Sequence, residues 1–276
     1  MPDTSTAPLL PLVITPDQLD AHRHSKRVVM IDVPAQPRRY MQGHIPGAYV
    51  LDYTRLLSGQ APTPAGMPEA SVIAALLSRL GITSDTHVVA YDDEGGGCAS
   101  RLLWTLALVG HSHYSLLDGG LHAWSADQKP MTTSPSLPTS THYILGPQNR
   151  SVATNADALL ASPNTFTIWD ARSAEEYRGE VGHTPRLGHI PGAINLDWRQ
   201  LFNPHNAYRL HPKEELRALL THHGLTPDRH IVAHCQSHHR SSLAWFVGHY
   251  LGYPHISAYP GAWLEWGSRT DTPITH

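Results

Sequence analysis

The sequence predicts two α/β domains, each a mainly parallel five-stranded sheet flanked by helices. Two observations lead to this prediction. Short apolar runs rich in β-branched residues alternate with amphipathic helical stripes, and one order of motifs occurs twice along the chain. A length of 276 residues leaves room for two domains with a core each.

The internal repeat rests on three matches that follow one another in the same order. The hexapeptide GHIPGA stands at 43–48 and again at 188–193. Residues 81–92 (GITSDTHVVAYD) align with 224–235 (GLTPDRHIVAHC) at one constant offset, and a looser match pairs the segments GGLHAW and GAWLEW. Three matches in one order indicate a duplicated domain.

Each copy contains the same kinds of predicted element. Short apolar runs of this length are typical of buried strands. They lie at 28–33, 88–91, 166–169 and 231–234. Apolar stripes at helical spacing end at glycines, which favour the left-handed conformation of a helix C-terminus. These stripes run from Val72 to Leu80 before Gly81, from Leu216 to Leu220 before Gly224, and from Leu243 to Leu251 before Gly252.

A segment rich in Pro, Ser and Thr separates the two copies. We therefore expect one domain at 1–130, an exposed linker at 131–150 and a second domain at 151–276.

Composition excludes several classes of protein. The net charge of −3 offers no basic field for nucleic acid or an anionic membrane, and no apolar run reaches membrane-spanning length. The segment Met1–Leu12 has no Lys or Arg before its apolar run, so we expect no signal peptide. Two cysteines cannot form a disulfide framework, which suits the cytoplasm. The 21 histidines show no CxxC or HExxH pattern, so we expect no metal and no other cofactor.

Cys235 stands where chemistry is expected. It follows the predicted strand 231–234 and precedes a helix, at the edge where parallel sheets place their ligands. Backbone N–H groups of the turn, the positive end of the helix and Arg240 all favour a thiolate there, and they also favour an oxyanion beside it. Cys98 lies farther from its strand end, at Asp92, and is expected to be structural.

These motifs resemble the tandem-domain rhodaneses over nearly the whole chain. The resemblance is carried by GHIPGA after strands ending in Asp32 and Asp170, by a cysteine loop closed by Arg240, and by the terminal YPGAWLEWG. The loop CQSHHRS is especially similar to that of the single-cysteine bacterial thiosulfate:cyanide sulfurtransferases. Asp92 takes the place of Cys235 in the first copy, so the resemblance implies that this domain is catalytically inactive.

The resemblance implies sulfur transfer in two steps. Cys235 would take the outer sulfur of thiosulfate as a persulfide and pass it to cyanide or to a protein or small-molecule thiol. Site residues follow from the matching positions. Cys235 is the nucleophile, and the cradle and substrate-binding residues are Gln236, Ser237, His238, His239, Arg240 and Ser241, with Arg186 as a second anion contact. His238 and His239 are expected at the substrate entrance, where protonation would attract a dianion. The tandem architecture is compatible with a monomer.

Several alternatives remain open at this point. Enzymes that use 3-mercaptopyruvate as the sulfur donor resemble this chain but carry an arginine where Glu176 stands, and a CGSG-type loop. Cysteine phosphatases and arsenate reductases place one residue more between cysteine and arginine, which makes a wider cradle. A non-catalytic binding module and a histidine-rich metal binder are the remaining alternatives.

Overall fold

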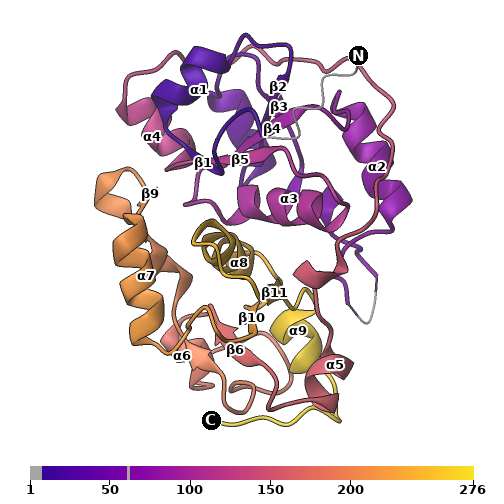
Figure 1. The fold of residues 1–276 in the computed structure, drawn as a ribbon, viewed down its shortest axis with the longest axis vertical. Helices are drawn as coiled ribbons and strands as arrows, with labels where there is room; N and C mark the ends of the chain where they lie inside the picture. The colour runs from indigo at the N-terminus through magenta and orange to yellow at the C-terminus, as the bar shows by residue number, and fades with distance from the viewer. Residues whose placement is uncertain (1–7, 61–62) are drawn as a thin grey trace.

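The computed structural model describes residues 8–60 and 63–276. The N-terminal segment considered above therefore lies largely outside the described residues. The chain forms two lobes, the N-terminal half above the C-terminal half, which meet at the helices α3 (Gly97–Leu108) and α8 (Arg240–Tyr250) (Figure 1).

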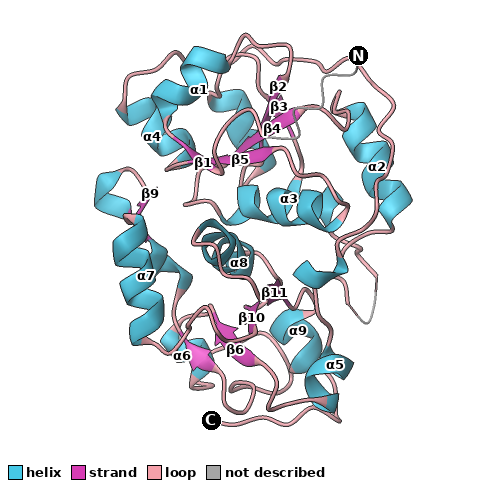
Figure 2. Ribbon diagram, viewed as in Figure 1, coloured by secondary structure: helices cyan, strands magenta, loops and turns pink. Residues whose placement is uncertain are grey.

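The N-terminal lobe is built on five parallel strands in the order β1-β5-β4-β2-β3, with helices on both faces (Figure 2). Its strands are β1 (Val13–Ile14), β2 (Val28–Asp32), β3 (Tyr49–Val50), β4 (His87–Tyr91) and β5 (Tyr114–Leu117). Besides α3, its helices are α1 (Pro16–His22), α2 (Ala70–Arg79) and α4 (Gly120–Ala126).

The C-terminal lobe repeats this arrangement with four parallel strands in the order β11-β10-β6-β7. They are β6 (Thr167–Asp170), β7 (Ile194–Asn195), β10 (Ile231–His234) and β11 (Ile256–Ala258). Its helices are α5 (Ala156–Ala161), α6 (Ala174–Tyr177), α7 (Lys213–His222), α8 and α9 (Ala262–Trp266), and a small antiparallel pair joins β8 (Phe202–Asn203) to β9 (Arg209–Leu210).

The predicted fold class is confirmed, with one difference in the second sheet. Its fifth strand is reduced to a single parallel bridge between Ala153 and Ala258. The reason is local: Asn155 caps α5, so the chain turns into a helix after one residue pair. The predicted helix ends hold as well, because Gly81, Gly224 and Gly252 all adopt positive φ, between 73° and 80°.

The GHIPGA repeat makes the same two contacts in both lobes, a stacked histidine–tyrosine pair and a tyrosine hydrogen bond to the final alanine of the motif. In the first, His44 stacks on Tyr40 at 3.6 Å, and the Tyr40 hydroxyl donates to the Ala48 carbonyl. In the second, His189 stacks on Tyr177 at 3.7 Å, and the Tyr177 hydroxyl donates to Ala193. These motifs therefore serve packing, and their matching geometry supports a duplication.

One apolar core runs through both lobes. Every residue of α3 is buried, and so are residues 241–248 of α8, because the two helices pack against each other across the seam. A single buried cluster includes Trp104 from one lobe and Trp245 from the other. The loops that precede α3 and α8 therefore lie close to this shared core.

The segment at 131–150 has no regular helix or strand before residue 150 and is mostly exposed, but it is held to the first lobe. Thr141 donates its N–H to Ser78, Asn149 donates to Leu108 at the end of α3, and the Tyr143 ring is buried. The predicted linker is therefore packed against the first lobe over part of its length.

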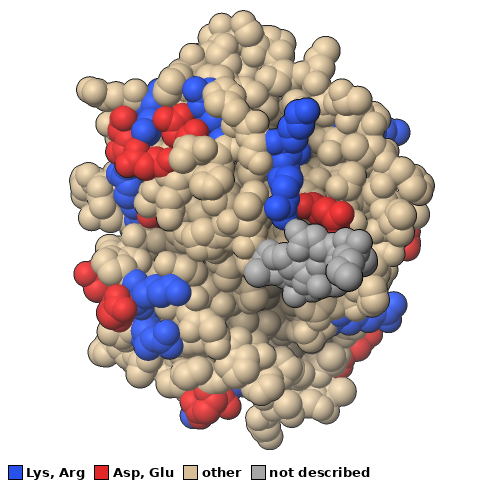
Figure 3. All heavy atoms as spheres, turned by 45° about the horizontal axis from the view of Figure 1, so that its top comes forward, with Lys and Arg blue, Asp and Glu red and all other residues tan. Residues whose placement is uncertain are grey.

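Charged side chains of both signs lie near one another on the face drawn in Figure 3, with no continuous basic surface on that face. Among the described residues, no helix has the length and apolar character needed to cross a membrane.

Candidate active site

Cys235 lies at the carboxyl end of β10, in the middle of the C-terminal sheet, and is fully buried. The chain then makes a short turn and enters α8 at Arg240. Two backbone N–H groups of α9 fix this turn. Trp263 donates to the Cys235 carbonyl and Leu264 donates to the Gln236 carbonyl, each at 2.9 Å. The terminal YPGAWLEWG segment therefore positions the loop that begins at Cys235.

The Cys235 sulfur lies in a polar, positively charged environment. The Ser241 hydroxyl donates to its Sγ at 3.4 Å. Burial by itself raises the pKa of the Cys235 thiol. The charge of Arg240, followed by the hydroxyl and the backbone N–H of Ser241, outweighs burial and holds that pKa below the ordinary value. This environment favours a thiolate.

Arg240 is fixed by Glu176, which comes from α6. The two guanidinium nitrogens reach the two carboxylate oxygens at 2.5 and 2.8 Å. Glu176 also closes a capping box with Ser173 at the start of α6. Burial raises the pKa of Glu176, but the bridge to Arg240 lowers it more, so the carboxylate stays charged beside Arg240.

His238 is fully buried in the seam between the lobes, and this burial does not support the expected place at the substrate entrance. Its ring meets Trp104 of the other lobe edge-on at 4.4 Å, and its Nδ1 lies 2.9 Å from the Ser241 hydroxyl. Burial, then the charges of Arg101 and His239, lower the pKa of His238 well below its ordinary value. A neutral His238 donating from Nδ1 leaves the single Ser241 proton for the Cys235 sulfur.

His238 also has a left-handed backbone, with φ of 54°. The corresponding position in the first lobe is a glycine, Gly95, with φ of 102°. A side chain in this conformation costs backbone energy. Contacts from the other lobe hold it there: Arg101 donates to the His238 carbonyl and also to the carbonyls of Leu56 and Ala65.

His239 faces the first lobe rather than open solvent. Its Nε2 contacts the Glu94 carboxylate, and its ring packs against Trp198 at 5.5 Å. Burial lowers the pKa of His239, but Glu94 raises it more, and the net shift is upward. His239 therefore supplies positive charge near Cys235 as part of an ion pair with Glu94.

A buried ion pair lies behind the loop. Asp170, at the end of β6, binds Arg172 through both oxygens, and His234 Nε2 lies 3.5 Å from it. The guanidinium of Arg172 covers the Trp263 ring at 4.3 Å. Burial raises the pKa of Asp170, yet His234 and Arg172 lower it below the ordinary value. The pair connects β6, β10 and α9 beneath Cys235.

The first lobe holds an anion of its own at the matching position. The Asp92 carboxylate accepts backbone N–H groups from Glu94, Gly96 and Ala99 at 3.1, 2.8 and 2.9 Å. Burial, then the charge of Glu94, raises the pKa of Asp92 to about 6. This strand–loop–helix turn is therefore built to surround a negative group, a carboxylate in one copy and a sulfur in the other.

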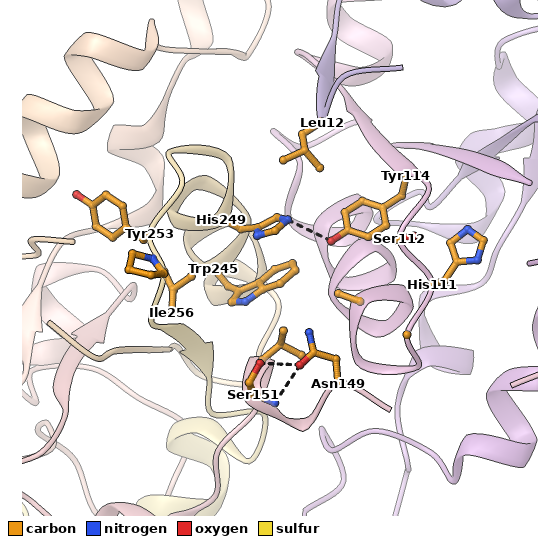
Figure 4. A pocket seen from close by; sticks show the side chains of 14 residues that line it. Leu12, His111, Ser112, Tyr114, Asn149, Ser151, Trp245, His249, Tyr253 and Ile256 are labelled. Atoms are coloured by element: carbon orange, nitrogen blue, oxygen red, sulfur yellow. Dashed lines mark hydrogen bonds between the residues drawn. The ribbon is translucent and has the colours of Figure 1, made fainter. Parts of the chain in front are cut away.

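A separate cleft of about 530 Å³ opens between the lobes, lined by Tyr114, Trp245 and His249 among others (Figure 4). The residues from Cys235 to Ser241 do not line it. Cys235 and this cleft are therefore distinct places in the molecule.

Comparison with known proteins agrees with this geometry. The profile of the Rhodanese-like domain matches residues 15–127 and 152–269. The chain belongs to the rhodanese family. It is 39% identical to a thiosulfate sulfurtransferase of Azotobacter vinelandii, over 96% of this chain and 97% of that protein. It is 38% identical to one from Pseudomonas aeruginosa, with the same coverage. The structure of SseA from Escherichia coli, titled as a study of 3-mercaptopyruvate sulfotransferases, matches with TM-score 0.81 at 28% identity, over 92% of this chain and 99% of that one.

The structure does not bring every predicted site residue to the loop formed by residues 235–241. Arg186 uses both terminal nitrogens on the C-terminal segment, where it donates to the carbonyls of Thr272 and Trp266. These contacts do not support the expectation that Arg186 is a second anion contact. Cys98 lies at the start of α3, opposite His239, and burial together with the charges of Asp92 and Glu94 raises its pKa.

Four residues that shape the rhodanese loop were missed in the sequence. Glu176 had a signal, because Ser173 and Glu176 have the spacing of a capping box, although nothing local pairs Glu176 with Arg240. Arg101 and Glu94 reach the loop only through the tertiary fold, and Arg172 acts from behind it through Asp170 and Trp263.

Proposed function

We propose that this rhodanese transfers the sulfane sulfur of thiosulfate to a thiophilic acceptor through a persulfide on Cys235. The observation that carries the proposal is the surroundings of Cys235: Ser241 donates to its sulfur, and Arg240, fixed by Glu176, supplies the positive charge that favours the thiolate needed for sulfur transfer. The two relatives named above as thiosulfate sulfurtransferases support the choice of donor.

Transfer proceeds in two displacements. The Cys235 thiolate attacks the outer sulfur of thiosulfate, the sulfur–sulfur bond of thiosulfate breaks, and sulfite leaves with the electron pair. The acceptor, cyanide or a thiolate, then attacks the outer sulfur of the persulfide, and Cys235 leaves as a thiolate. Each step releases an anion, so fixed positive charge and N–H donors at the loop lower both barriers.

The loop residues divide this work. Ser241 donates to the Cys235 sulfur, and Arg240 supplies charge from a position that Glu176 fixes. Gln236, Ser237 and His239 are the partly exposed residues of the turn, and we assign them to the substrate side. We assign His238 as a positioning residue, because it orients the Ser241 hydroxyl.

Glu176 also bears on the choice of donor. Mercaptopyruvate carries a carboxylate, and Glu176 places a charge of the same sign next to Arg240. Both oxygens of Glu176 already bind the Arg240 guanidinium, which is then not free to pair with the carboxylate of mercaptopyruvate. Thiosulfate has no carboxylate to pair, so we assign it as the donor. Turnover of 3-mercaptopyruvate far faster than thiosulfate by the purified protein would contradict this assignment.

We further propose that residues 1–130 form an inactive domain and 151–276 the catalytic one, joined by 131–150. Support comes from Asp92, whose carboxylate fills the position of the nucleophile in the first lobe. The shared core of the lobes suits a monomer, and the two unpaired thiols suit the cytoplasm. Gel filtration with light scattering would measure the oligomeric state.

Intact mass spectrometry tests the persulfide. After thiosulfate treatment in metal-free buffer, the wild type should gain about 32 Da, one sulfur atom, and lose it on addition of cyanide. Cys235→Ala should gain nothing, whereas Cys98→Ala should gain the same mass as the wild type. Equal loss in both variants would contradict a single site. No gain in the wild type would favour a binding module or a phosphatase, which phosphate and arsenate esters would then probe.

A further inference from the structure

Three potential metal ligands converge beside the nucleophile loop, and sulfur transfer does not require them together. Glu94 and Cys98 come from the turn and first residues of α3, and His239 comes from the loop before α8. A carboxylate oxygen, the Cys98 sulfur and a His239 ring nitrogen all lie within 4.8 Å of one another. No sequence spacing could show this group, because its members come from the two lobes.

The geometry needs little adjustment to hold an ion. Tetrahedral zinc has bonds of about 2.0–2.3 Å, which places neighbouring ligand atoms about 3.3 to 3.6 Å apart. The three atoms here lie within 4.8 Å of one another, so side-chain shifts on the order of an ångström would bring them to these separations. The chain at Gly97 also approaches closely, since a Cβ at that position would lie 2.6 Å from the His239 Nε2. Backbone packing therefore holds the His239 ring against the start of α3.

The surroundings point to a bound group as well. The Tyr53 hydroxyl is buried and has no hydrogen-bond partner among the described residues, and the Tyr53 ring meets His239 edge-on at 5.8 Å. Buried hydroxyls normally find a partner, so an orphan one beside three ligands calls for an explanation. A water on a metal ion would supply that partner.

We propose that Glu94, Cys98 and His239 form a divalent zinc-class metal site that joins the two lobes next to Cys235. Thiolate and imidazole ligands select zinc, cobalt or nickel over magnesium and calcium. On binding, Cys98 loses its thiol proton to solvent, and the sulfur, the His239 Nε2 and a Glu94 oxygen each donate an electron pair to the ion. The contact between His239 and Glu94 is replaced by two bonds to the metal.

Binding there has a consequence for the loop. His239 is part of the turn that carries Cys235, so an ion would tie that turn to α3 of the inactive lobe. A turn held in this way should move less, so we expect the metal-bound protein to accept sulfur on Cys235 more slowly than the metal-free protein.

Cobalt(II) titration of the full chain tests the site in Cys235→Ala, where Cys98 is the sole remaining thiol. We expect one cobalt per chain, with a near-ultraviolet thiolate-to-cobalt absorption band and a rise in Tm. Adding Cys98→Ser should abolish the band. Glu94→Gln and His239→Gln, each in the same background, should weaken cobalt binding by at least about tenfold, since loss of even an outer partner of a metal ligand costs this much.

A matched control is His222→Gln, which changes an exposed histidine beside His223 on α7 and should leave the band unchanged. Absence of the band in Cys235→Ala would overturn the proposal. So would a band that survives Cys98→Ser, or cobalt binding that is lost in His222→Gln. Should the Cys98→Ser protein fail to fold, as judged by circular dichroism, the Glu94→Gln arm still decides, because it retains the thiol.

Discussion

The chemistry at the scale of single residues depends on how the pKa of one fully buried thiol, Cys235, is held below its ordinary value. Arg240 and Ser241 offset the burial of Cys235, and Glu176 holds Arg240 in place. A neutral His238 orients the Ser241 proton. Each partner is itself fixed by a second contact, which is how a short loop maintains a precise environment.

Replacing Arg240 should shift the pH dependence of sulfur loading. The thiolate fraction rises as pH rises through the Cys235 pKa, and Arg240 is the strongest influence that lowers this pKa. Arg240→Gln should therefore move the midpoint to higher pH and slow loading at neutral pH by roughly tenfold to a hundredfold. Arg240→Lys should keep more of the low midpoint, since it keeps the charge but loses the two-pronged bridge. Stopped-flow loading rates across pH measure both, and an unshifted midpoint in Arg240→Gln would contradict this role.

At the scale of elements, α6 serves the active loop although it contains only four residues. Its capping box and its bridge to α8 use the same Glu176 carboxylate. A short helix has little stability of its own. It holds its place because its ends are tied to the elements around it.

Glu176→Gln should lower the free energy of unfolding by about 2 kcal/mol at neutral pH, a typical value for hydrogen bonds to a charged group. The folded-state pKa of Glu176 is depressed, so its stabilisation is present above the ordinary carboxyl pKa and is lost as pH falls through the lower folded value. The difference between wild type and variant should narrow as pH falls below about 4. Urea unfolding at several pH values measures it, and a difference that does not change with pH would exclude the charged bridge as its cause.

The elements around the site were predictable from sequence where the signal was local. The strand before Cys235, the loop and the helix after it follow from apolar patterning and from glycine stops. The environment of His238 was not predictable, because a polar loop indicates exposure and only the other lobe buries it. The partners of Arg240 and His239 come from distant parts of the chain, and single-sequence patterns carry no information on such pairs.

At the scale of the whole molecule, the N-terminal lobe completes the Cys235 loop of the C-terminal lobe. Arg101 supports the His238 backbone, Trp104 covers its ring, and Glu94 holds His239. The nucleophile loop is therefore an interface between lobes as well as a part of the second domain.

A substitution in the first lobe should therefore disturb sulfur loading in the second. Gly97→Ala would place a Cβ 2.6 Å from the His239 ring and force that ring to move. Overpacking of this kind costs about 1–3 kcal/mol, so Tm should fall along with the loading rate. Gly146→Ala is the matched control, because a Cβ there meets nothing within 4 Å. Equal loading rates in the two variants would show that the lobes act independently.

The carboxylate held in the first lobe bears on how such a duplicated protein can change over time. Asp92 accepts three backbone N–H groups of its own turn, so these donors have a partner although no thiolate stands at this position. A duplicated domain can therefore carry a carboxylate instead of a thiol at this turn and keep its shape. Such a copy can then specialise in supporting the other copy.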